Sequence, residues 1–144
     1  MNDTNYFVDK SSQNLMTEED MSLLFLIPLV QMAWAHGAIS PREKQAIFDA
    51  ARKEGIDHRS SLNDTLDKWL VYQPGRQFYD ECLGLIKNTL QAMTVKEREQ
   101  KRNKMFERCR TVAASAGGKS PMDLNHHVSG EEKELLTELE QTLS

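Results

Sequence analysis

The chain has 144 residues, of which 28% are charged and 39% hydrophobic, and 22 acidic against 18 basic residues leave a formal net charge of -4. This length fits one domain that can bury a core without disulfides or a structural metal. The low counts of glycine and proline, 7 and 4, exclude a collagen-like or low-complexity chain. The mildly acidic net charge gives no overall electrostatic attraction to nucleic acid, so no nucleic-acid partner is expected.

Three features of the chain predict a cytoplasmic protein with no transmembrane segment. Cys82 and Cys109 form no C-x-x-C pattern, which is typical of a reduced compartment. Residues 1–20 are polar and acidic, so no signal peptide is expected. The most apolar stretch, residues 23–35, is shorter than the roughly 20 residues that a membrane span needs, and it is interrupted by Pro28. We therefore expect a buried core helix there.

Helix starts and stops are easy to recognise along the chain. In a capping box, a hydroxyl residue and an acid three positions later together cap the start of a helix. The sequence contains four such pairs: Thr17 with Asp20, Ser40 with Glu43, Thr94 with Glu97, and Ser129 with Glu132. Helix ends are predicted at Gly37, Gly55 and Gly117. The predicted helices are, in chain order, a short one within 6–15 and then 18–36, 41–54, 61–71, 76–93, 95–116 and 130–143.

The hydrophobic pattern predicts an all-α fold. No segment alternates with a period of two, so a compact bundle of six or seven helices is expected, with residues 18–36 at its centre because they are apolar on nearly all sides. Residues 1–16 are expected to be a partly ordered N-terminal segment, and 17–144 the domain. Trp34 and Trp69 are predicted core residues, the alternative being that Trp69 or Tyr72 is exposed to a partner.

One segment combines small, capping and acidic residues around a helix junction. Residues 32–47 read Met-Ala-Trp-Ala-His-Gly-Ala-Ile-Ser-Pro-Arg-Glu-Lys-Gln-Ala-Ile. In physical terms, Gly37 turns the chain, Ser40 caps the next helix and Glu43 completes the capping box. These structural roles account for the segment without any ligand.

The segment resembles the junction motif of the tellurite-resistance TerB-like family, which is related to the N-terminal domain of DjlA-type co-chaperones. In that family a helix ends in Ala-x-Ala-Asp-Gly, and a small hydrophobic residue, Ser and a helix-starting Glu follow. Residues 112–118 and 128–132 repeat this order more faintly. The resemblance covers about residues 23–143, and it implies a TerB-like bundle of two pseudo-repeated halves in a bacterial stress-response protein.

The resemblance also implies a divalent-cation site, because TerB-like proteins are associated with cation binding by acidic residues at these junctions. Glu43, Glu131 and Glu132 match the family's acidic positions. Such carboxylates suit Ca²⁺ or Mg²⁺. His36 stands where the family has Asp, and this change lowers the expected affinity for those ions.

A second set of ligand types lies in the loop that precedes the last helix: Asp123, His126 and His127. If the two junctions lie close together, His36 joins one of these histidines and a Glu in a set that suits zinc or another transition metal. The alternative is structural, because a histidine at a helix C-terminus interacts favourably with the helix dipole and a His pair in a polar loop is solvated.

The predicted helix 95–116 carries the main basic cluster. Its candidate partner-binding residues are Lys96, Lys101, Arg102, Lys104 and Arg108. Mixed Lys and Glu at short spacing favour a solvated face with i,i+4 pairs. The alternative is docking on an acidic protein partner, or on the acidic stretches 1–20 and 131–140, within one chain or across a homodimer.

Catalytic motifs are missing from the sequence. There is no nucleophile elbow, complete phosphate-binding loop, dinucleotide fingerprint or H-E-x-x-H motif, so no enzyme is expected. The predicted function is a non-enzymatic module that acts through protein–protein interaction, as the resemblance implies. The alternative is a divalent-metal-binding sensor that uses the acids and histidines of the helix junctions.

Overall fold

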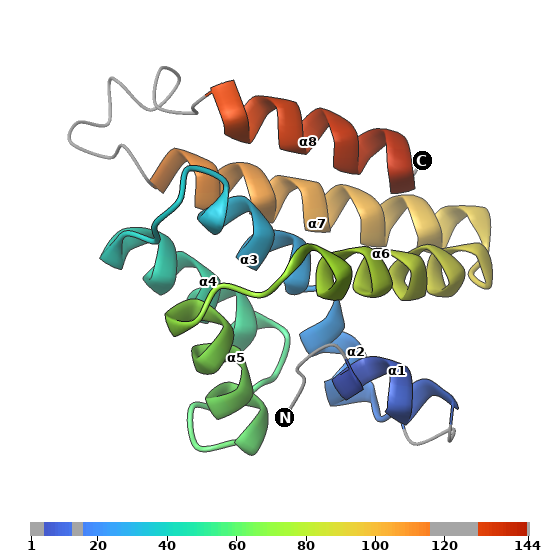
Figure 1. The fold of residues 1–144 in the computed structure, drawn as a ribbon. Coiled ribbons are helices and arrows are strands. Elements are labelled where there is room, and N and C mark those ends of the chain that lie inside the picture. The colour runs from blue at the N-terminus through green and yellow to red at the C-terminus, as the bar shows by residue number, and fades with distance from the viewer. Residues whose placement is uncertain (1–4, 13–15, 116–129, 144) are drawn as a thin grey trace.

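The computed structural model describes residues 5–12, 16–115 and 130–143. These residues form α-helices and no strand, which confirms the predicted all-α fold (Figure 1). None of these helices has the length and apolar character needed to cross a bilayer. The described helices are α1 (Asn5–Ser12), α2 (Glu18–Leu24), α3 (Ile27–Trp34), α4 (Pro41–Lys53), α5 (Ser61–Val71), α6 (Arg76–Gln91), α7 (Val95–Ser115) and α8 (Gly130–Leu143).

The described helices number eight rather than six or seven, because the predicted helix 18–36 is divided into α2 and α3. At the break the Leu26 N–H donates to the Leu23 carbonyl at 3.0 Å, three residues back instead of four. Two positions later Pro28 has no N–H with which to continue the helix. The predicted central position is confirmed for α3, which is largely buried and packs against α4, α6, α7 and α8.

The arrangement of the last two helices determines where the two predicted junctions lie. Figure 1 shows α7 and α8 side by side and running in opposite directions, with α3 beneath α7. The start of α8 consequently lies at the same end of the bundle as the turn between α3 and α4. Residues far apart in the sequence therefore meet at this end.

The predicted caps explain why the helices begin and end where they do. The capping boxes of α2 and α4 are complete, and Thr94 caps α7 by accepting a hydrogen bond from the Glu97 N–H at 3.2 Å. Gly37 and Gly55 follow α3 and α4 with φ angles of 95° and 88°, where a side chain would strain the backbone. The predicted cap Ser129 and the predicted stop Gly117 lie outside the described residues.

An aromatic cluster joins α1, α5 and α6. Trp69 is 1% exposed, and its ring centroid lies 5.6 Å from that of Phe7 and 5.1 Å from that of Phe78. Trp34 is partly buried, and its Nε1 donates to the Trp69 carbonyl at 2.9 Å. Trp69 is therefore a core residue as predicted, whereas Tyr72, at 70% exposed, is the residue of this segment that faces solvent.

The two cysteines pack in the core, as predicted. Cys82 and Cys109 are free thiols, and both are buried. Burial raises the pKa of both thiols, to about 12 for Cys109. Both therefore stay protonated near neutral pH and behave as small hydrophobic side chains.

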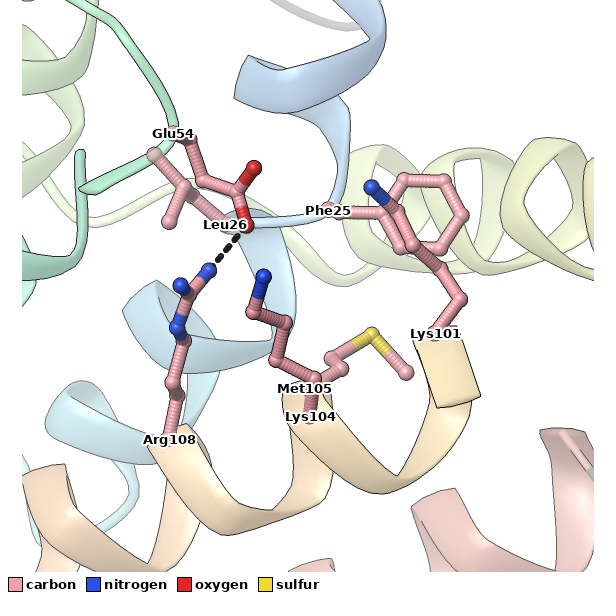
Figure 2. Close-up of a pocket in the computed structure, with 7 residues that line it drawn as sticks. All are labelled: Phe25, Leu26, Glu54, Lys101, Lys104, Met105 and Arg108. Carbon is pink, nitrogen blue, oxygen red and sulfur yellow. Dashed lines mark hydrogen bonds and ion pairs between the residues drawn. The ribbon is translucent and has the colours of Figure 1, made fainter. Parts of the chain in front are cut away.

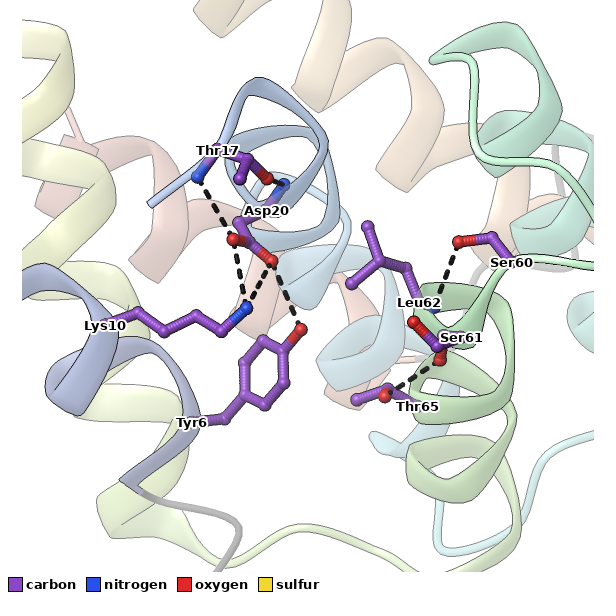
Figure 3. A network of polar contacts seen from close by, with 8 residues as sticks. All are labelled: Tyr6, Lys10, Thr17, Asp20, Ser60, Ser61, Leu62 and Thr65. Carbon is purple, nitrogen blue, oxygen red and sulfur yellow. Dashed lines mark hydrogen bonds and ion pairs between the residues drawn. The ribbon is translucent and has the colours of Figure 1, made fainter. Parts of the chain in front are cut away.

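A buried carboxylate attaches α1 to the start of α2 (Figure 3). Asp20 is 1% exposed and accepts hydrogen bonds from the Thr17 N–H at 3.1 Å, the Tyr6 hydroxyl at 3.2 Å and the Lys10 ammonium at 3.2 Å. Burial by itself would raise the pKa of Asp20, but the Thr17 and Lys10 hydrogen bonds outweigh it and hold that pKa below its ordinary value. The folded chain therefore favours the ionised form.

Replacing Asp20 by Asn is expected to lower the free energy of unfolding by about 2 kcal/mol at pH 7, since hydrogen bonds to a charged group are lost. Because the pKa is lowered on folding, the carboxylate stabilises the protein above the ordinary pKa of about 4 and loses this effect as the pH falls below it. Chemical denaturation at pH 7 and near pH 3 measures the difference. Glu19→Gln, a change at the exposed neighbouring residue, provides the control. If Asp20→Asn lowered the free energy of unfolding equally at both pH values, the stabilising role of the ionised Asp20 carboxylate would be contradicted.

Candidate metal centre

Three ligand-type side chains meet where the α3–α4 turn approaches the start of α8. One ligand atom from each of His36, Glu43 and Glu132 lies within 4.8 Å of the others. Two of the residues flank the α3–α4 turn, and the third lies in the first turn of α8. The structure thus brings together the two junctions that the sequence pattern related to each other.

The capping chemistry of α4 orients the first of the carboxylates. Glu43 Oε1 accepts a hydrogen bond from the Ser40 N–H at 2.8 Å, and the Ser40 hydroxyl accepts one from the Glu43 N–H at 3.2 Å. The other oxygen, Oε2, lies 3.2 Å from His36 Nε2. Gly37 makes the tight turn that places the histidine beside the carboxylate. One oxygen therefore caps the helix while the second faces the site.

Both carboxylates are almost completely buried. Glu43 is 0% exposed and Glu132 is 1% exposed. Burial raises the pKa of Glu43 above its ordinary value, and the charge of Glu132 raises it further, although hydrogen bonds from Ser40 and the nearby His36 act in the opposite direction. Two buried carboxylates side by side are unfavourable unless a positive charge compensates them. A proton or a bound cation can supply that charge.

The donor set fits a first-row divalent cation. One imidazole nitrogen with carboxylate oxygens is typical of Zn²⁺, whereas Ca²⁺ prefers six to eight oxygens. Ligand atoms around a tetrahedral zinc lie about 3.4 Å apart. His36 Nε2 and Glu43 Oε2 are 3.2 Å apart, and all three ligand atoms lie within 4.8 Å of one another. The His36 side chain is 29% exposed, so the site is accessible from solvent on this side.

Of the four remaining predicted ligands, the structure describes one. Glu131 is exposed and lines a separate groove beside α8. Asp123, His126 and His127 lie outside the described residues. A ligand set that includes either histidine of that loop stays a prediction.

The basic residues of α7 make several contacts within the chain. Arg108 forms an ion pair with Glu54 at the end of α4, next to Lys104 (Figure 2). Burial by itself would raise the pKa of Glu54, but this pairing lowers it below its ordinary value. Lys101 lies over the ring of Phe25, with its Nζ 5.0 Å from the ring centroid.

The other predicted partner contacts differ in their surroundings. Arg102 donates to the Leu143 carbonyl at 3.4 Å, so it attaches the end of α8 to α7. Lys96 and Lys104 are exposed. Docking of this basic face on a partner, or on either acidic stretch of the chain, stays a prediction.

The groove that runs along α8 has no counterpart among the features predicted from the sequence. Among the residues that line it are Gln31 of α3, Tyr79 of α6 and Glu138 of α8, which no sequence motif connects. The spacing of Glu131, Glu134 and Glu138 on one helical face was the available signal.

Comparison of the chain with protein-family models, with curated proteins and with solved structures gave no match.

Proposed function

We propose that this chain is a non-enzymatic, cytoplasmic helical module that binds one divalent cation and acts through interaction with a protein partner. The observation that carries the proposal is the meeting of His36, Glu43 and Glu132, two of them buried carboxylates from distant parts of the chain. The two buried carboxylates lie beside an accessible histidine, and an imidazole with carboxylates is a donor set that supports cation binding.

The position of these residues explains how binding would affect the fold. A bound dication supplies positive charge to both carboxylates. His36 and Glu43 hold the α3–α4 turn, and Glu132 holds the first turn of α8. Binding at all three residues would therefore add a link between the start of α8 and the α3–α4 turn, beyond the contacts that α8 already makes with α3, α6 and α7.

The order of residues at the α3–α4 junction supports a TerB-like role in bacterial stress response or tellurite resistance. Gly37, Ser40 and Glu43 match that motif and make the turn and the complete capping box that the motif implies. His36 in place of the motif's Asp favours a transition metal over Ca²⁺ or Mg²⁺.

Cation titration of untagged, chelator-treated protein tests this function. Unfolding followed by circular dichroism should show stabilisation by Zn²⁺ or Mn²⁺ and less by Ca²⁺, reaching about 2.7 kcal/mol at a cation concentration 100-fold above Kd. His36→Ala should reduce the effect sharply. The matched control is His58→Ala, which removes an exposed histidine far from the site in the sequence.

Two outcomes of that titration would contradict the proposal. One is equal stabilisation of the His36 and His58 variants, because the site would then lie elsewhere. The other is no stabilisation of the unaltered protein by any of the three cations.

A further inference from the structure

A groove runs between α8, α3, α6 and the linker before α6. It consists of two adjoining hollows of about 310 Å³ and about 270 Å³. The two hollows share five lining residues: Gln31, Gln73, Tyr79, Leu135 and Glu138. We call this feature the α8 groove. It is separate from the proposed metal centre, although Glu131 and Glu132 are consecutive in α8.

Two buried hydrogen-bonding atoms belong to residues that line the α8 groove. The Tyr79 hydroxyl and Gln31 Oε1 are buried, and neither makes a hydrogen bond within the described ranges. Tyr79 as a whole is 7% exposed. Burial raises the pKa of its hydroxyl above the ordinary value, so the group is neutral at all ordinary pH values. Buried polar atoms without partners are rare in proteins, and each of these two keeps an unused capacity to accept a hydrogen bond.

Carboxylates dominate the edge of the α8 groove. Glu131, Glu134 and Glu138 occupy positions i, i+3 and i+7 of α8, so they share one face and span about 10 Å. All three are exposed. On the α6 side Arg76 and Asp80 lie 3.9 Å apart and largely offset each other's charge. The groove as a whole is therefore negative and rich in acceptors.

The complementary ligand is an organic cation with several N–H donors. A guanidinium can donate to the carboxylates on α8, and its donors complement the unpartnered Gln31 amide oxygen and Tyr79 hydroxyl of the lining. The acidic row continues along α8 beyond the reach of one such group. Because the row is this long, a peptide segment with successive basic side chains fits it better than a small free molecule does.

We propose that the α8 groove binds an arginine side chain from a basic segment of a partner protein, with Glu131, Glu134 and Glu138 engaging the flanking basic residues. This inference rests on the interaction role in the proposed function and specifies the chemistry of the partner. Arginine is preferred to lysine because its fork of donors matches several acceptors at once.

Fluorescence anisotropy of the full chain with a labelled peptide of three Arg-Gly-Gly repeats tests the proposal. Binding should weaken with salt, and a peptide with citrulline in place of arginine should bind at least about tenfold more weakly, because each charged hydrogen bond is worth about one decade in affinity. Glu138→Gln should cause a similar loss. Its matched control is Glu140→Gln, the same change on an exposed residue of α8 outside the lining of the groove.

Tyr79→Phe probes the interior of the α8 groove. It removes only a hydroxyl that has no partner in the described part of the chain, so unfolding should be unchanged or shifted to higher temperature while peptide affinity falls. Equal binding of the citrulline peptide, equal losses in the Glu138 and Glu140 variants, or binding of spermine without binding of the peptide would overturn the proposal. Cation titration of the same samples separates the two claims, because it reports on the metal centre whatever the peptide does.

Discussion

Replacing Glu43 by Gln is expected to stabilise the cation-free protein and to abolish its response to a divalent cation. Gln keeps the capping box, because its amide oxygen can accept the Ser40 N–H hydrogen bond that Glu43 now accepts. It also removes one of two buried charges, which should raise the free energy of unfolding on the order of 1 kcal/mol at neutral pH. The cation-dependent gain of about 2.7 kcal/mol at 100-fold Kd should disappear.

The pH dependence gives this prediction a further check. Burial raises the pKa of Glu43, so the folded protein carries the charge at a cost that grows as the pH rises through that pKa. The stabilisation by Gln should therefore shrink as the pH falls and Glu43 becomes protonated. Urea denaturation with and without Zn²⁺ at several pH values measures both effects. Glu131→Gln is the matched control, and a Glu43→Gln protein that still responds to the cation would contradict the account.

Replacing Trp69 by Ala is expected to lower the free energy of unfolding by about 3–5 kcal/mol. Trp69 is 1% exposed, and it packs against Phe7 and Phe78, so its loss leaves a cavity where α1, α5 and α6 meet. The Trp34 hydrogen bond to its backbone carbonyl does not require the side chain. Urea denaturation measures the loss.

Tyr72→Ala provides the control for the Trp69 variant. Tyr72 lies three residues later and is 70% exposed, so its truncation should change stability by no more than about 0.5 kcal/mol. Similar losses in the two variants would contradict the position assigned to the aromatic cluster.

The local features of the fold were predictable because they depend on neighbouring residues. The helices Ser61–Val71 and Gly130–Leu143 begin and end where the pattern predicts. The division of the predicted helix 18–36 was missed because its hydrophobic residues continue across the break. Pro28 was the local signal for it, since it cannot donate the hydrogen bond that an unbroken helix needs.

The candidate metal centre was predictable in part. His36, Glu43 and Glu132 were candidates because two helix junctions share an order of residues, and the packing of α8 brings these junctions together. The α8 groove could not be predicted in the same way. Gln31 and Tyr79 lie on different helices, and only tertiary packing makes them neighbours.

The most direct test of the central claim is anomalous diffraction from crystals of the chain grown with Mn²⁺ or Zn²⁺. We expect one strong anomalous peak between His36, Glu43 and Glu132, and no such peak in crystals of Glu43→Gln grown under the same conditions. A peak elsewhere on the chain, with none among these three residues, would contradict the claim.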